Sequence, residues 1–222
     1  MSEYQFAVGL QPINRLPFIE AKPMFTVLPI TGGQLSLSGK TMKTTFQMTK
    51  KELQKIIQSW ENMPLVITHC WEHPEATDIL LSIAFDDSQA INWRAMYLFE
   101  LIHYQHPELV IPYLPAMTDF LLTTKNSSKK RHLLKLISLH EIPEENVALL
   151  LNFCIQEFTN AAEPIAVRVH AMQILFNIAQ KEPDFAGELI DLIENEIEYH
   201  GSAGISSRGL KLLKKLKSPD KP

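Results

Sequence analysis

Cysteine and long apolar runs are both scarce in this sequence. It has two cysteines in 222 residues, Cys70 and Cys154. Two are too few for a disulfide framework and suit a reducing compartment, although they are enough for one pair. No stretch approaches the roughly 18 uncharged apolar residues of a membrane span, and the start of the chain, with Glu3, Arg15 and neighbouring prolines, lacks the apolar core of a signal peptide. We therefore expect a cytoplasmic protein without a membrane segment.

A large net charge is absent as well. The formal net charge is −4, with 45% hydrophobic and 21% charged residues, which is ordinary for a folded domain. Four basic and two acidic residues precede Thr49, so the remainder holds 17 basic and 23 acidic residues. An acidic balance exerts no overall attraction on nucleic acid or anionic membrane. Neither is therefore an expected partner.

The first 48 residues differ in composition from the rest. They contain four of the eight glycines and four of the fourteen prolines, and this spacing breaks any helical period. Apolar pieces on either side of Gly32 and Gly33 fit a small hairpin, and they fit a loosely ordered segment equally well. We predict that residues 1–48 are a loosely ordered extension and that residues 49–222 are the folded domain.

Helical signals begin at Thr49. Thr49 and Glu52 stand at the spacing of a capping box, and apolar residues follow at helical spacing from Leu53 to Trp60. We predict a helix over residues 49–60 and a short second helix over residues 64–72.

Two features then recur at intervals of nearly forty residues. A proline followed by an acid occurs four times, and each pair predicts a helix start, because proline loses no hydrogen bond there and the acid complements the helix dipole. We place these first helices over residues 79–85, 109–122, 147–158 and 189–197. Each is followed by a polar break and a second helix with an arginine in its first turns. The arginine spacings are 37, 37 and 40, and the residues are Arg94, Arg131, Arg168 and Arg208.

Helix pairs at this period, with no strand pattern after residue 48, predict an all-α, HEAT/armadillo-like α-solenoid of about four helix pairs. One pair cannot bury its apolar faces alone, so neighbouring pairs stack and share a continuous core. The last helix, over residues 206–216, is lysine-rich on its outer side and fits the polar cap of a terminal repeat.

Three strings carry a closer resemblance: NWRAMYLFELI at 92–102, EPIAVRVHAMQILFNIAQKEP at 163–183 and YHGSAGISSRGLKLLKKL at 199–216. They resemble a small family of bacterial HEAT-like proteins, found chiefly in Bacteroidetes, that has no established activity. Its members are sometimes labelled adenylosuccinate lyase. The lyase fold is a much longer chain, and its serine-containing loop with a Met-Pro-x-Lys pattern has no counterpart here. From the repeat architecture we expect a non-enzymatic scaffold without a cofactor, which binds a protein or peptide on its inner helical face.

Local motifs offer weaker candidates. His69, Cys70 and His73 form a cluster of zinc-type ligands, but no second pair stands at finger or ribbon spacing, and we expect no metal. Cys154 lies on an apolar stripe and is expected in the core. The GSAG turn at 201–204 lacks a Walker pattern, and Gly201 is better explained as a helix C-cap.

The recurring arginines are the main candidate site, since the second helices of such an array line its inner surface. One hypothesis is structural: each arginine pairs with an acid in the preceding turn, as Asp87 before Arg94 and Glu163 before Arg168 would allow.

The other hypothesis is that the arginines face a ligand. Arg131 and Arg208 have no acid in the preceding turn, so with Lys130 they are the strongest candidates for binding an acidic or phosphate-bearing segment; Arg94 and Arg168 complete the candidate set.

The alternative function is DNA-alkylation repair, which certain HEAT-like proteins perform on a basic face. Lys125, Lys129–Arg131 and Lys135 form a local basic cluster. The repeat region is acidic as a whole, however, and its three tryptophans gather in the first third, where packing explains them better than base stacking: Trp60, Trp71 and Trp93.

Overall fold

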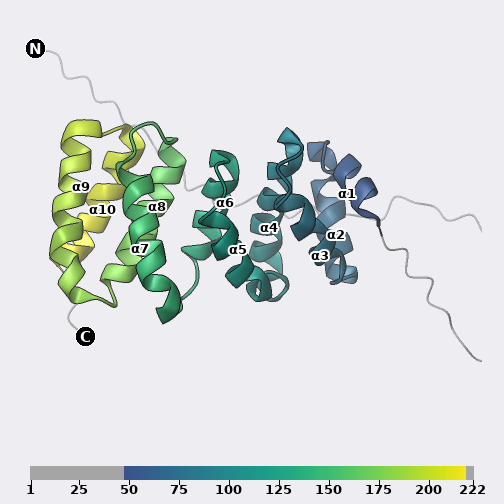
Figure 1. Cartoon of the computed structure of the whole chain (residues 1–222), viewed down its shortest axis with the longest axis horizontal. Helices are drawn as coiled ribbons and strands as arrows, with labels where there is room; N and C mark the ends of the chain where they lie inside the picture. The colour runs from purple at the N-terminus through teal and green to yellow at the C-terminus, as the bar shows by residue number, and fades with distance from the viewer. Residues whose placement is uncertain (1–47, 219–222) are drawn as a thin grey trace, which may run out of the picture. The chain divides into compact units, whose positions relative to one another are not determined.

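The structure is a computed structural model that describes residues 48–218. The predicted extension and its hairpin lie outside the described residues, apart from Met48, which is buried. Within the described range the chain forms ten α-helices and short 3₁₀ turns, without a strand. Successive helices pack as pairs, and the pairs stack along one axis (Figure 1). The predicted all-α solenoid is confirmed.

The first pair consists of α1 (Lys50–Ile56) and α2 (Met63–Glu72). The predicted capping box is present: the Glu52 N–H donates to Thr49 Oγ1 at 3.3 Å, and the Thr49 N–H donates to Glu52 Oε2 at 2.8 Å. The helix predicted to reach residue 60 ends earlier, because a turn and a 3₁₀ segment (Trp60–Asn62) carry the chain into α2.

Four further pairs follow the first. Their first helices are α3 (Ala76–Ala84), α5 (Leu114–Leu121), α7 (Glu144–Thr159) and α9 (Ala186–His200). Their second helices are α4 (Trp93–Gln105), α6 (Ser127–Ile137), α8 (Ile165–Ala179) and α10 (Ala203–Lys217). Further 3₁₀ turns span Ala90–Asn92, Pro107–Leu109, Ile111–Tyr113 and Pro183–Phe185.

Helix α5 is much shorter than its predicted range of 109–122. Two 3₁₀ turns occupy residues 107–113, and the α-helix begins at Leu114. Proline inside a helix removes a backbone donor and clashes with the preceding turn. An α-helix in this segment therefore starts only where Pro112 lies outside it and Pro115 falls in its first turn.

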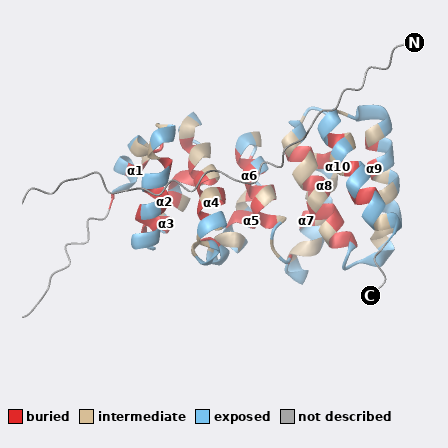
Figure 2. Cartoon of the chain, turned by 180° about the vertical axis from the view of Figure 1, so that it is seen from behind, coloured by how far each residue is buried: buried red, intermediate tan, exposed pale blue. Residues whose placement is uncertain are grey.

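The second helices form the spine of the array. They contact one another in series from α2 to α10, whereas the first helices α5 and α7 contact each other little. Buried residues follow this spine through the length of the array (Figure 2).

The backbone is closely packed at Gly201, in the turn between α9 and α10, and a substitution there measures how little space is available. Gly201 is the C-cap of α9, as predicted, and its φ of −71° is open to any residue. A Cβ added there would stand 2.2 Å from the Ile197 carbonyl oxygen. We expect Gly201→Ala to lower the free energy of unfolding by about 1–3 kcal/mol, measured by urea denaturation.

The matched control is Gly187→Ala in the same helix. No atom lies within 4 Å of a Cβ added at Gly187, so its stability is expected to stay within about 0.5 kcal/mol of the parent. Equal effects at the two glycines would contradict the close contact at Gly201.

Candidate functional site: a basic face on the second helices

Charge is segregated by helix in the last three pairs. The second helices α6, α8 and α10 carry ten basic residues and no acidic residue, whereas the first helices α5, α7 and α9 carry nine acidic residues and no Lys or Arg. The basic residues are Lys129, Lys130, Arg131, Lys135, Arg168, Arg208, Lys211, Lys214, Lys215 and Lys217. The chain is acidic overall, yet the second helices of these three pairs are strongly basic.

Five of these ten cations make ion pairs inside the array. Lys129 pairs with Asp87 at 2.5 Å, Lys130 with Glu157 at 2.6 Å and Glu163 at 3.0 Å, and Arg168 with Glu196 at 2.5 Å. Lys135 and Lys217 pair with Glu100 and Glu194. The other five make no ion pair with any residue of 48–218: Arg131, Arg208, Lys211, Lys214 and Lys215.

The predicted site residues therefore divide into two groups. Lys130 and Arg168 are buried, and both form ion pairs with carboxylates inside the array. Arg168 also donates from Nε to the Phe158 carbonyl at 2.8 Å. Arg131 is exposed and Arg208 is half-buried, and both keep their charge available on the surface.

Arg94 lies away from both groups. Its guanidinium donates to the carbonyl oxygens of Ile57 at 3.2 Å and Gln58, just after α1, and lies 4.3 Å from the centroid of the Trp60 ring. Cations near a helix C-terminus satisfy its last carbonyls. Arg94 thus joins the first two pairs of the array.

The predicted arginine–acid pairs are wrong. Arg94 does not pair with Asp87, which instead pairs with Lys129, and Arg168 does not pair with Glu163, which pairs with Lys130. The acids of the turns therefore reach across to another repeat and do not stay within their own.

The arginines do not form a row in space, because their sequence spacing differs from the packing register. Across α6 and α8, Asn177 Nδ2 donates to the Ser138 carbonyl at 2.8 Å, a separation of 39 residues. Across α8 and α10, a Cβ added at Gly204 would touch Ile165, which is also 39 residues away. The contact between His103 and His140 joins positions 37 apart, whereas at these two contacts the touching positions differ by 39 residues.

This register aligns Arg131 with His170. Arg168 lies two positions before His170, which is a rotation of about 200° around the helix, so Arg168 faces Glu196 on α9. Burial, and then the charges of Lys135, Arg208 and Arg131, lower the pKa of His170 to about 4. Lys135, Arg208 and Arg131 are therefore near enough to His170 to oppose its protonation. We call these four residues the His170 cluster.

Lys135 links the cluster to a buried network on α4. It donates to Glu100, whose other oxygen lies 2.8 Å from His132 Nδ1. Burial raises the pKa of Glu100, but the hydrogen bonds from His132 and Lys135 outweigh burial and lower it to about 2. Glu100 is thus held ionised, and Lys135 is held in place beside Arg131.

Comparison with protein-family models matches residues 42–216 to a HEAT repeat domain. The chain belongs to the HEAT repeat family. The match covers all five helix pairs and ends within α10, so the basic face is part of the HEAT domain. Comparison with curated proteins and with solved structures finds no match.

The weaker candidates are packed into this HEAT domain. Cys154 is buried in the core, as predicted, and burial raises the pKa of the Cys70 thiol to about 12. His69 is also buried, while His73 Nδ1 lies 3.6 Å from Glu75. Within residues 48–218 no group of three His, Cys, Asp or Glu side chains is placed to hold a metal, and no helix there has the length and apolarity to cross a membrane.

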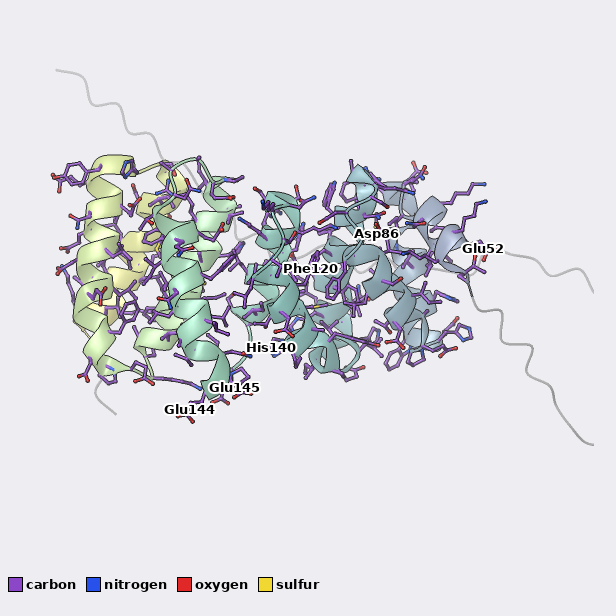
Figure 3. The ribbon with its side chains drawn as sticks, in the orientation of Figure 1. Glu52, Asp86, Phe120, His140, Glu144 and Glu145 are labelled. Carbon is purple, nitrogen blue, oxygen red and sulfur yellow. The ribbon has the colours of Figure 1, made fainter. Side chains whose placement is uncertain are left out.

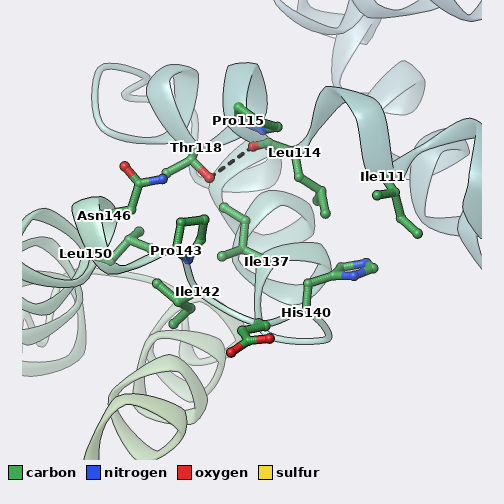
Figure 4. A pocket seen from close by; sticks show the side chains of 11 residues that line it. Ile111, Leu114, Pro115, Thr118, Ile137, His140, Ile142, Pro143, Asn146 and Leu150 are labelled. Carbon is green, nitrogen blue, oxygen red and sulfur yellow. Dashed lines mark hydrogen bonds between the residues drawn. The ribbon is translucent and has the colours of Figure 1, made fainter. Parts of the chain in front are cut away.

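A second feature lies on the first-helix side of the domain. Between α5 and α7 there is a cavity of about 210 Å³ with mostly apolar walls (Figure 4). It lies where the short helix α5 makes few contacts with α7, whose other side packs on α8. We call it the α5–α7 groove; it is lined by Ile111, Leu114, Pro115, Thr118, Ile137, His140–Pro143, Asn146 and Leu150.

Sequence analysis missed His170 and the segregation of charge. His170 carries no motif, and only the packing of α6, α8 and α10 brings it near Arg131 and Arg208. The segregation was visible in the sequence, because counting charges helix by helix reveals it, whereas the total for the whole region conceals it.

The buried pair of Arg168 and Glu196 yields a stability prediction. We expect Arg168→Met to lower the free energy of unfolding by about 3–5 kcal/mol, because Glu196 would remain as a buried charge without its partner. The double variant Arg168→Met, Glu196→Leu should recover most of this loss. Urea denaturation measures both, and a double variant as unstable as the single one would contradict the ion-pair account.

Histidine protonation yields a pH prediction. Burial is the largest factor lowering the pKa of four histidines below the usual 6.5: His69, His103, His140 and His170. The unfolded chain then binds more protons below pH 6.5 than the folded chain, so stability falls as the pH decreases through this range. We expect the melting temperature to drop between pH 7 and pH 5, and to drop less in His170→Gln. His106→Gln is the control, and an equal drop in all three proteins would refute the assignment.

Proposed function

We propose that this HEAT domain is a non-enzymatic scaffold whose second-helix face binds an acidic segment of another protein or a phosphate-bearing peptide. The observation that carries the proposal is the His170 cluster, where Arg131 and Arg208 have no carboxylate partner within the described residues. The two reduced, buried cysteines suit a cytoplasmic location.

The physical basis is a local positive potential. Cations gathered on one face steer an anionic partner to that face even when the whole molecule is acidic. A guanidinium presents paired donors that match carboxylate and phosphate oxygens. The carboxylates on α7 and α9 repel the same partner from the other side, so the binding face is selected by both attraction and repulsion.

The alternatives are enzymes. They are DNA-alkylation repair on the same basic face, and the lyase activity named in the label of the narrower bacterial family. The aromatic groups available for base stacking are partly engaged: the Trp60 ring lies 5.8 Å from Trp93 and 5.6 Å from Tyr97, between centroids, and the Trp71 ring stacks on His106 at 3.9 Å. Base release from alkylated DNA, or turnover of adenylosuccinate, would replace the scaffold proposal.

The test is a charge reversal in the cluster. We expect Arg131→Glu, Arg208→Glu to weaken binding of a fluorescein-labelled decaglutamate peptide, and of a phosphoserine peptide of equal length, by about tenfold or more in fluorescence anisotropy. Binding to the parent protein should weaken between 50 and 500 mM salt, because salt screens exposed charges.

The matched control is Lys51→Glu, Lys55→Glu on α1, which makes the same charge change at two exposed positions without ion pairs among the described residues. Equal weakening in both double variants would show that only net charge matters and would refute the site. A large fall in melting temperature with unchanged peptide binding would assign the arginines to the scaffold instead.

A further inference from the structure

The α5–α7 groove has an apolar floor and acidic residues beside it: Glu141 lines it and pairs with Lys181, and Glu144 and Glu145 directly follow the lining residue Pro143. Glu144 and Glu145 are exposed at the end of α7 beside His140 (Figure 3), and neither makes an ion pair with a residue of 48–218. Leu114, Ile137 and Leu150 line the cavity itself. Aliphatic cavities of roughly 150 Å³ accept a benzene molecule, so this larger one has room for an aliphatic side chain. The groove therefore fits an apolar residue flanked by cations.

Helix α10 presents this combination on its own exposed ridge. Its buried side packs through Ile205, Gly209 and Leu212, whereas Leu210 is 59% exposed on the opposite side. Lys211 and Lys214 flank Leu210, are exposed, and make no ion pair with any described residue. We call Leu210, Lys211 and Lys214 the α10 ridge.

We propose that the α10 ridge of one molecule docks in the α5–α7 groove of a second copy of this chain. Leu210 enters the cavity, and Lys211 and Lys214 lie against Glu144 and Glu145. The pairing follows from complementary charge and apolar character on two surfaces of the same molecule. Lys211 lies one turn after Arg208 on α10, so the two proposals are told apart by Leu210, Glu144 and Glu145, which lie outside the His170 cluster.

The contact joins two different surfaces, so it is heterologous. After pairing with one neighbour, each molecule keeps either its groove or its ridge unoccupied, and assembly continues until it closes into a ring or ends by dilution. One helix in one groove buries less area than the roughly 1,200 Å² of a stable interface. The association should therefore be weak, dependent on concentration and sensitive to salt.

Sedimentation velocity of the full chain tests the proposal. We expect the weight-average mass to be near 25.3 kDa at micromolar concentration and to rise at several hundred micromolar in 50 mM salt. In 500 mM salt the rise should disappear. Leu210→Asp should abolish it, whereas Tyr199→Asp, which places the same charge at an exposed aromatic position on α9, should leave it unchanged.

Charge exchange identifies the two surfaces. Glu144→Lys, Glu145→Lys should be monomeric alone, and so should Lys211→Glu, Lys214→Glu. Mixing the two variants should restore association, because the lysine-bearing groove of one meets the glutamate-bearing ridge of the other and the unmodified groove and ridge also meet. Glu188→Lys is the control for removing a first-turn acid from another first helix.

Three results would overturn the proposal. The first is a mass of 25.3 kDa at every concentration and salt. The second is association that survives Leu210→Asp, which would place the contact elsewhere. The third is two monomeric charge variants that stay monomeric when mixed. None of these bears on peptide binding by the His170 cluster, so each proposal can fail alone.

Discussion

The packing of second helices against one another is the interaction on which the rest of this domain depends. Helix α8 shows its consequence most clearly, because it contacts α6, α7, α9 and α10 and buries nine of its fifteen residues. A helix enclosed in this way has little surface left for charge, and any charge directed inward must find a partner. Arg168 and Glu196 are that case, whereas His170 lies on the narrow side of α8 that remains open.

Internal ion pairs fix how the repeats meet. Lys129 reaches from α6 to Asp87 in the preceding repeat, and Lys130 reaches to Glu157 and Glu163 in the following one. Burying charge is costly, and a pair at best offsets the cost. Such pairs therefore favour one alignment of neighbouring repeats over others. If one helix moved along its neighbour by one turn, each buried charge would lose its partner.

The two surfaces discussed above have different origins. The His170 cluster arises where second helices stack on one another: a separation of 39 residues aligns Arg131 with His170, and Arg208 stands one position before the matching residue of α10. The α5–α7 groove arises where packing is irregular, because prolines shorten one first helix and leave its neighbour uncovered. Regular stacking thus builds the basic face, and a local fault in the stacking opens the acidic groove.

The sequence by itself determined the helical class, the period of nearly forty residues, the capping box at Thr49 and the burial of Cys154. Each of these depends on neighbours within one or two turns of chain, where periodicity and capping chemistry decide the outcome. The segregation of charge between first and second helices can also be read from the sequence.

Only the tertiary structure decided which cations remain on the surface. Arg168 and Arg131 stand 37 residues apart and look equivalent in the sequence. The packing register of 39 residues rotates one into the core and leaves the other exposed. That register is set by how side chains of separate helices interlock, and no local pattern records it. For the same reason Asp87 and Glu163 pair with lysines of other repeats, and the groove beside α7 appears only once α5 and α7 are placed side by side.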